Sequence, residues 1–94
     1  MQIQHQQKTI GDFYILNERN EKVADMSYVM KNEQVMVIEH TNVDKSLAGQ
    51  GIGKKLVDAG VQYARSNKLT IIPECPYALA VFEKTPDYAD VWEK

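Results

Sequence analysis

Three glycines at alternate positions are the feature of this sequence that most directly suggests chemistry. Gly49, Gly51 and Gly53 stand where a loop passes into a stretch with helical periodicity. Glycine removes side chains at such a turn and leaves the first backbone amides of the helix exposed. Those amides and the positive end of the helix dipole attract anions, and Lys54 and Lys55 add positive charge. The turn therefore predicts a binding site for a phosphate group.

The spacing of the glycines disagrees with two common nucleotide-binding motifs. A Walker loop needs a glycine where Ala48 stands and a serine or threonine after Lys54, and both are missing. The dinucleotide motif GxGxxG needs its third glycine where Lys54 or Leu56 stands, depending on the glycine from which it begins. We therefore expect neither hydrolysis of a nucleoside triphosphate nor a Rossmann-type site.

The first half of the chain, which must position this turn, has the pattern of strands separated by polar turns. Phe13 to Leu16 is a short aromatic and aliphatic run, and Val23 to Met30 alternates between apolar and polar residues. Gln34 to His40 is apolar on both faces through its centre, as in an interior strand. We predict three antiparallel strands joined in a meander.

The second half has the period of a helix. From Gly51 to about Ser66 the apolar residues recur every three or four positions, which predicts an amphipathic helix. Gly60 inside it costs about 1 kcal/mol relative to alanine, and close approach to the sheet would explain its presence. Leu69 to Ile72 is a short apolar run, and a crossover helix would place it parallel to the strand from Gln34 to His40.

Two prolines mark the starts of two short helices near the C terminus. Pro76 suits a first helical turn with Cys75 near its N-cap, and Thr85-Pro86-Asp87 repeats the signal for a helix from Pro86 to Trp92. The predicted fold is α+β with α/β character: three antiparallel strands, helix, parallel strand and two short helices. We expect residues 1–8 to be flexible and residues 9–94 to form one domain.

Composition argues against several functional classes. Eleven basic and thirteen acidic residues give a net charge of −2 and are scattered, which argues against nucleic-acid binding. Cys75 is the single cysteine, and no Cys/His cluster has the spacing of a zinc site. No apolar run approaches the roughly 20 residues of a membrane-spanning helix, and the N terminus lacks a signal-peptide pattern. We expect a cytoplasmic protein without metal, nucleic-acid or membrane partners.

The wider pattern around the turn resembles a subgroup of small GCN5-related N-acetyltransferase-like proteins. Gly51-Ile52-Gly53 matches the second half of their Gln/Arg-x-x-Gly-x-Gly/Ala turn, although Ala48 stands where that motif usually has Gln or Arg. The other matching residues are His40-Thr41, Val43, Leu47, Gly49-Gln50, Pro73-x-Cys75-Pro76-Tyr77 and Pro86-x-Tyr88. The resemblance covers nearly the whole chain from Phe13 onward.

The resemblance implies a minimal version of that superfamily's fold, in which two parallel strands splay apart and acetyl-CoA, the cosubstrate, lies in the gap. The acceptor would be an unidentified amine, either a small molecule or a protein group. The implied cofactor-binding residues are Ile38, Glu39, His40, Val43, Gly49, Gln50, Gly51, Ile52, Gly53, Lys54, Cys75 and Tyr77.

The resemblance implies direct attack of the amine, with Glu39 or His40 as the base. Cys75 offers a second route, because a thiolate at a helix N-cap could accept the acetyl group covalently. A buried packing role for Cys75 is the alternative to catalysis. Two other functions remain open at this point: a non-catalytic module that binds acetyl-CoA or CoA, and a cofactor-free interaction domain in which the glycine turn is only architectural.

Overall fold

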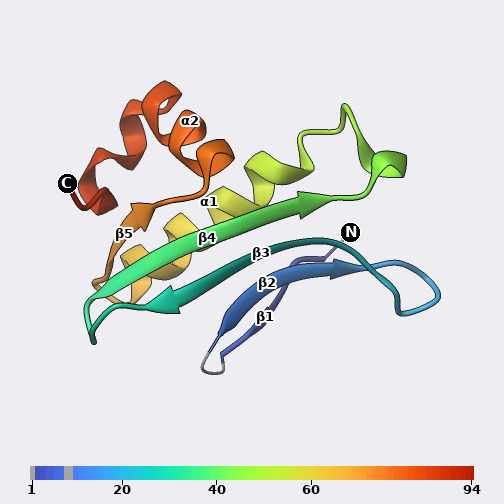
Figure 1. Ribbon diagram of the computed structural model, residues 1–94, viewed down its shortest axis with the longest axis horizontal. Helices are drawn as coiled ribbons and strands as arrows, with labels where there is room; N and C mark the ends of the chain where they lie inside the picture. Colours follow the sequence, from blue (N-terminus) through green and yellow to red (C-terminus); the bar gives the residue numbers. More distant parts are fainter. Residues whose placement is uncertain (1, 8–9) are drawn as a thin grey trace.

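Five strands form one mixed sheet in the order β1-β2-β3-β4-β5 in the computed structural model, which describes residues 2–7 and 10–94 (Figure 1). All neighbouring strands are antiparallel except β4 and β5, which are parallel. The predicted α+β class and the parallel last strand are confirmed. The strands are β1 (Gln4–Gln6), β2 (Gly11–Leu16), β3 (Lys22–Met30), β4 (Val35–Val43) and β5 (Thr70–Pro73).

Helix α1 (Ile52–Ser66) crosses one face of the sheet and lies behind β4 in Figure 1. A single 3-10 turn, η1 (Lys45–Leu47), precedes it, and α2 (Pro76–Lys84) and η2 (Pro86–Val91) follow β5. The last predicted helix is therefore present as a 3-10 helix. Within the described part of the chain, no helix has both the length and the apolar character needed to cross a lipid bilayer.

The core lies between α1 and the sheet. Leu56 and Val57 of α1 are fully buried, and so are Met26 and Met36 on the facing strands. Gly60 serves the close approach that its position suggested, because a Cβ atom there would be 2.8 Å from the Met26 Cε atom. The amphipathic pattern of the sequence thus faces the sheet as predicted.

The N-terminal segment contains a strand that the sequence did not predict. Within residues 1–8, which we expected to be flexible, Gln4–Gln6 form an edge strand that pairs with β2. His5 explains this order, since its ring stacks on Phe13 with the centroids 4.0 Å apart and its Nε2 atom hydrogen-bonds the Tyr28 hydroxyl. Contacts with distant aromatic rings, rather than local propensity, therefore hold β1. Met1 and Lys8 of that range lie outside the described residues.

Strand β4 contains a one-residue bulge at Glu39. Tyr28 of β3 pairs with Ile38, whereas the preceding Ser27 pairs with His40, so Glu39 has no partner in the ladder. The bulge puts Glu39 and His40 on the same side of the strand, facing away from α1. The alternation then resumes, and Thr41 faces α1 as Ile38 does. The bulge thus decides which side chains near the end of β4 reach each face.

Candidate functional site

Strands β4 and β5 separate half-way along β4. Their pairing ends where Ile38 meets Pro73. The Ile38 carbonyl oxygen accepts hydrogen bonds from the backbone amides of Glu74 and Cys75, at 3.1 and 3.0 Å, and α2 then leads the chain away. Beyond this point β4 continues to Val43, and no strand among the described residues pairs with it on that side. The separation leaves an open edge of β4 beside the start of α2.

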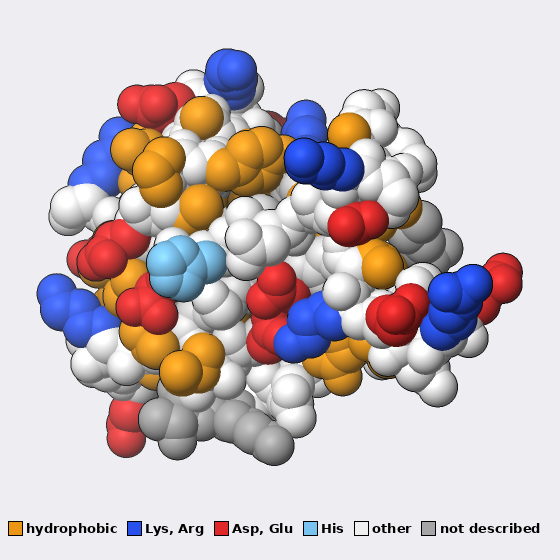
Figure 2. Space-filling model, turned by 45° about the vertical axis from the view of Figure 1, so that its right-hand side comes forward, with side chains coloured by type: hydrophobic (Ala, Val, Ile, Leu, Met, Phe, Trp, Pro, Cys, Tyr) orange, Lys and Arg blue, Asp and Glu red, His pale blue; other side chains and the backbone are white. Residues whose placement is uncertain are grey.

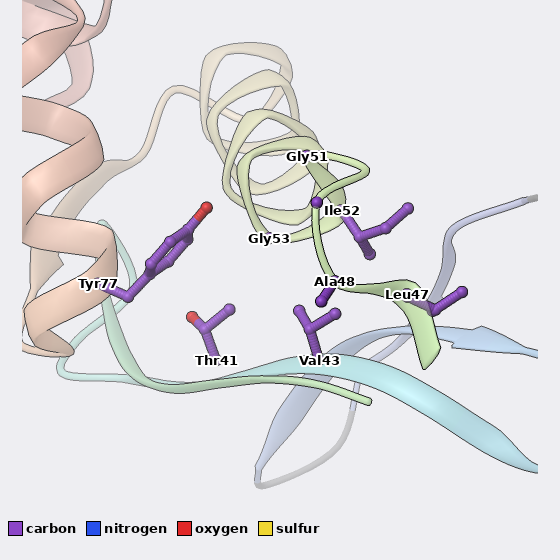
Figure 3. Close-up of a pocket in the computed structure, with 9 residues that line it drawn as sticks. Thr41, Val43, Leu47, Ala48, Gly51, Ile52, Gly53 and Tyr77 are labelled. Atoms are coloured by element: carbon purple, nitrogen blue, oxygen red, sulfur yellow. The ribbon is translucent and has the colours of Figure 1, made fainter. Parts of the chain in front are cut away.

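A cavity of about 320 Å³ lies in this opening, between β4, the glycine turn and α2. Figure 3 shows the side chains of Thr41 and Val43 rising from β4 toward the turn, with the Tyr77 ring on the α2 side. The lining residues are Thr41, Val43, Leu47, Ala48, Gly49, Gly51, Ile52, Gly53 and Tyr77. Segments from three elements that are distant in the sequence therefore meet around one space.

The glycine turn ends in an uncapped helix terminus. Gly49 and Gly51 have φ angles of 82° and 69°, in the left-handed region that favours glycine. Gly51 is the N-cap of α1 and gives no side-chain hydrogen bond, and the first turn of the helix has no acidic residue. Lys54 and Lys55 stand there instead, although positive charge near a helix N terminus is unfavourable. Free amides, the dipole and two lysines together favour an anion at this position.

Gly53 is a glycine for a different reason. Its backbone is helical, but a Cβ atom on it would lie 2.8 Å from both Cζ and Oη of Tyr77. The Tyr77 ring therefore packs directly on the first turn of α1 and bridges the two helices beside the cavity. Tyr77 as a whole is 43% exposed.

Cys75 lies next to the cavity at the N-cap of α2 and is buried. As a neutral thiol, its Sγ atom donates a hydrogen bond to the Thr41 hydroxyl oxygen over 3.6 Å. Burial by itself raises the pKa of the thiol, but the hydrogen bonds that the thiolate accepts, from the Ala78 amide, the Thr41 hydroxyl and the Tyr77 amide, outweigh burial and lower the pKa. The partner of Cys75 in the structure is Thr41, and not His40.

The structure brings only some of the predicted site residues to the cavity. Val43, Gly49, Gly51, Ile52, Gly53 and Tyr77 line it, and Cys75 adjoins it through Thr41. The Ile38 side chain is fully buried in the core, so it does not reach the cavity. The remaining predicted residues are absent from its lining: Glu39 and His40, which face the other side of the sheet, and the exposed Gln50 and Lys54.

Sequence reasoning did not select Thr41, Leu47 or Ala48, which also line the cavity. Counting back by two from Val43 would have found Thr41, since side chains alternate along a strand. Leu47 belongs to η1 and is mostly buried in the wall of the cavity. Asp44 is the N-cap residue of η1, and its side chain accepts a hydrogen bond from the Ser46 amide. In the described residues no group of three or more His, Cys, Asp or Glu side chains is arranged to hold a metal ion.

Residues 12–91 match the model of a protein family described as GCN5-related N-acetyl-transferase. The chain belongs to this family. The resemblance found in the sequence is therefore confirmed. Family membership supports an acetyltransferase function for this family member.

Solved structures of relatives agree with the assignment. A GCN5-like N-acetyltransferase candidate from Staphylococcus aureus is 38% identical, with a TM-score of 0.78, and the match covers 98% of this chain and 87% of that one. An aminoglycoside acetyltransferase from an uncultured soil metagenomic sample is 26% identical, with a TM-score of 0.64 and coverage of 84% and 58%. A Trypanosoma brucei acetyltransferase has the same fold at 24% identity, with a TM-score of 0.66 and coverage of 81% and 60%.

Proposed function

We propose that this family member binds acetyl-CoA in the cavity between β4, the glycine turn and α2, and transfers the acetyl group to an amine. The observation that carries the proposal is the N terminus of α1, which borders the cavity without a capping side chain or an acidic residue. A pyrophosphate there would accept hydrogen bonds from the amides that follow Gly51 and would offset the charges of Lys54 and Lys55.

Other features of the site suit the rest of the cofactor. The open edge of β4 offers backbone donors and acceptors to the amides of an extended pantetheine arm, in the manner of an added strand. Val43, Leu47 and Ile52 supply apolar contact along the cavity. The thioester then lies near Thr41 and Cys75, where β4 and β5 separate. Acetyl-CoA supplies the activated acetyl group, and the protein supplies position, polarity and a base.

In this proposal the cofactor and the amine bind on opposite faces of β4. The cofactor occupies the side of Thr41 and Val43, so an amine reaches the thioester from the side of Glu39 and His40. Either side chain accepts the proton that the amine loses as it attacks. Glu39 and His40 therefore fit the role of base better than that of cofactor contact, because the bulge turns both away from the cavity.

Cys75 supports a second route within the same function. Its lowered pKa and its hydrogen bond to Thr41 beside the cavity favour thiolate attack on the thioester, with loss of CoA and formation of an acetyl-cysteine. Mass spectrometry of the protein after incubation with acetyl-CoA tests this route. An acetyl group on Cys75 that an added amine removes supports it, and full activity of Cys75→Ala excludes it.

Calorimetric titration with acetyl-CoA, CoA and ATP tests the function first. We expect saturable binding of acetyl-CoA and CoA and none of ATP. Gly51→Asp and Gly51→Asn form a matched pair, since both residues tolerate the left-handed backbone and only one adds a negative charge. The aspartate variant should lose at least tenfold more affinity for acetyl-CoA than the asparagine variant. Equal affinities of the two variants would contradict a phosphate site at this turn. Binding of acetyl-CoA without turnover of any amine would favour the non-catalytic binding module.

A further inference from the structure

A row of polar side chains crosses the face of the sheet that α1 does not cover. The pairing register places Gln6, Asp12, Ser27 and His40 side by side on β1, β2, β3 and β4. In Figure 1 this face is turned to the viewer, and none of the described helices crosses it. Because adjacent strands are about 4.8 Å apart, Asp12 lies about 10 Å from His40. The row thus leads from the gap beside β4 to the Asp12 carboxylate.

Lys22 holds a primary ammonium group at the Asp12 end of this row. Its Nζ atom is 2.5 Å from Asp12 Oδ2 and 5.0 Å from the centroid of the Tyr14 ring. A carboxylate and an aromatic face together form a site that is suited to an alkylammonium ion. The Lys22 side chain is 47% exposed, so it can leave this position for solvent. The position of Lys22 therefore indicates that the site suits a primary ammonium group.

The carboxylates at this end of the row have acceptor oxygens that Lys22 does not bind. Asp12 is only 8% exposed, and among the described residues its buried Oδ1 atom has no hydrogen-bond partner. Asp25 lies on the same face and accepts a 3.3 Å hydrogen bond from the Asn42 amide group. The pKa of the Lys22 ammonium group is raised, mainly by its hydrogen bond to Asp12 and also by the charge of Asp25, so two carboxylates lie near one ammonium ion. A buried acceptor without a partner is costly, and a ligand with N–H donors would satisfy it.

The other end of the row is also negatively charged. His40 is exposed at the gap, and the bulge places Glu39 beside it on the same face. Figure 2 looks obliquely onto this side and shows acidic side chains around a histidine, with an acidic and a basic side chain in contact farther along. An acceptor that spans the row therefore meets negative charge at both ends.

We propose that this face binds an acceptor with at least two amino groups, as in a polyamine. One amine reacts at the gap, while a second, as an ammonium ion, replaces Lys22 at Asp12 and Asp25. The inference rests on the proposed function and names its substrate class. In the reaction the amine nitrogen bonds to the acetyl carbon, the thioester C–S bond breaks, and the amine proton passes by way of Glu39 or His40 to the departing thiolate. A monoamine fills only the reacting position and binds more weakly.

Steady-state kinetics with n-butylamine, putrescine and spermidine test the proposal, with acetylated product and free CoA measured by chromatography. We expect the KM for spermidine to be at least tenfold below that for butylamine. Lys22→Gln should lower the spermidine KM severalfold because it removes the competing ammonium ion, and it should leave the butylamine KM unchanged. Equal KM values for the monoamine and the polyamine, or no effect of Lys22→Gln on their ratio, would overturn the proposal.

Asp25→Asn provides a second variant, which leaves the buried Asp12 in place. It should raise the spermidine KM without changing the kcat, whereas Glu33→Gln, which removes an exposed carboxylate in the turn between β3 and β4, should change neither. A rise in KM of the same size in both variants would indicate only a general charge effect and would contradict a specific site at Asp25.

A binding measurement separates this inference from the proposed function. Spermidine is titrated into the isotopically labelled protein saturated with CoA, and the amide signals of Ser27 and Asn42 are followed by NMR. Shifts that saturate, and that Asp25→Asn weakens, support the polyamine site even if no acetyl transfer occurs. Absence of such shifts overturns it, while turnover of butylamine and spermidine with equal KM leaves the acetyltransferase function intact.

Discussion

The ring of Tyr77 lies against the backbone of Gly53, so that a Cβ atom on Gly53 would be 2.8 Å from the Tyr77 Cζ and Oη atoms. Two helices that are separated by β5 in the sequence therefore meet beside the cavity through an aromatic ring and a missing side chain. Because Gly53 has an ordinary helical backbone, the contact with Tyr77, and not backbone strain, sets the cost of replacing it.

This contact predicts coupling between substitutions at the two positions. In the wild-type protein, Gly53→Ala should change the free energy of unfolding little, because the helix propensity of alanine is offset by displacement of the Tyr77 ring. In a Tyr77→Ala background the same change should stabilise the protein by up to about 1 kcal/mol. Urea unfolding of the four proteins measures the coupling. Additive effects would show that the ring does not rest on Gly53 in solution.

Gly11 predicts a larger effect from the same kind of contact. A Cβ atom on Gly11 would meet the Tyr28 ring at 2.1 Å, and both residues are buried. Gly11→Ala should therefore cost about 1 to 3 kcal/mol, as is typical of overpacking a core. Urea unfolding again provides the measurement, and most of the loss should disappear in a Tyr28→Leu background. A loss of the same size in both backgrounds would place its cause in the β2 backbone instead.

The pair formed by Thr41 and Cys75 predicts how the thiol reacts. The pKa of the Cys75 thiol is lowered because hydrogen bonds, among them that from the Thr41 hydroxyl, outweigh the effect of burial. Thr41→Val should therefore raise the pH at which alkylation by iodoacetamide reaches half its maximal rate. Ser46→Ala removes an exposed hydroxyl outside the cavity and serves as the control. Identical pH profiles for all three proteins would contradict the assigned hydrogen bond.

His5 predicts a pH dependence of stability. Burial lowers the pKa of His5, so below the unfolded-state pKa of about 6.5 the unfolded chain binds more protons than the folded one. Its contribution to stability is present above that pH and is lost as the pH falls. The pKa of Tyr28 is raised to about 12, mainly by burial, so its phenol stays protonated while it shares a hydrogen bond with the His5 Nε2 atom.

Urea unfolding at pH 7.5 and pH 5.5 checks the His5 prediction. The wild-type protein should lose more stability on acidification than His5→Gln, and the difference between the two proteins isolates His5 from the other titrating groups. A steeper loss in His5→Gln would reverse the sign of the assigned shift.

The elements that follow from local pattern were predictable from the sequence. Helix α1 could be placed because its apolar residues recur with the helical period, and the turn could be placed because left-handed backbone selects glycine at positions 49 and 51. Strand β1 could not be found in this way. Gln4 to Gln6 have no strand pattern, and their order depends on Phe13, Tyr28 and Tyr63, which only the folded chain brings near His5.

The candidate site was predictable where it depends on glycine and not where it depends on register. Strand β4 was expected to end at His40, but it continues to Val43 and contains the bulge at Glu39. A bulge arises from pairing with the neighbouring strand and leaves no mark in the composition of its own strand. For that reason Thr41 was not selected, and Glu39 and His40 were assigned to cofactor contacts although they face the other side of the sheet.

The bulge at Glu39 also lets β4 accommodate one extra residue. If Glu39 were kept but paired with Ser27 in a regular ladder, every side chain beyond it would exchange faces. Thr41 and Val43 would turn outward, and His40 and Asn42 would point at α1. Deletion of Glu39 would instead leave Ser27 opposite His40 and Met26 opposite Thr41, so β4 tolerates a change of length here only because the bulge absorbs it.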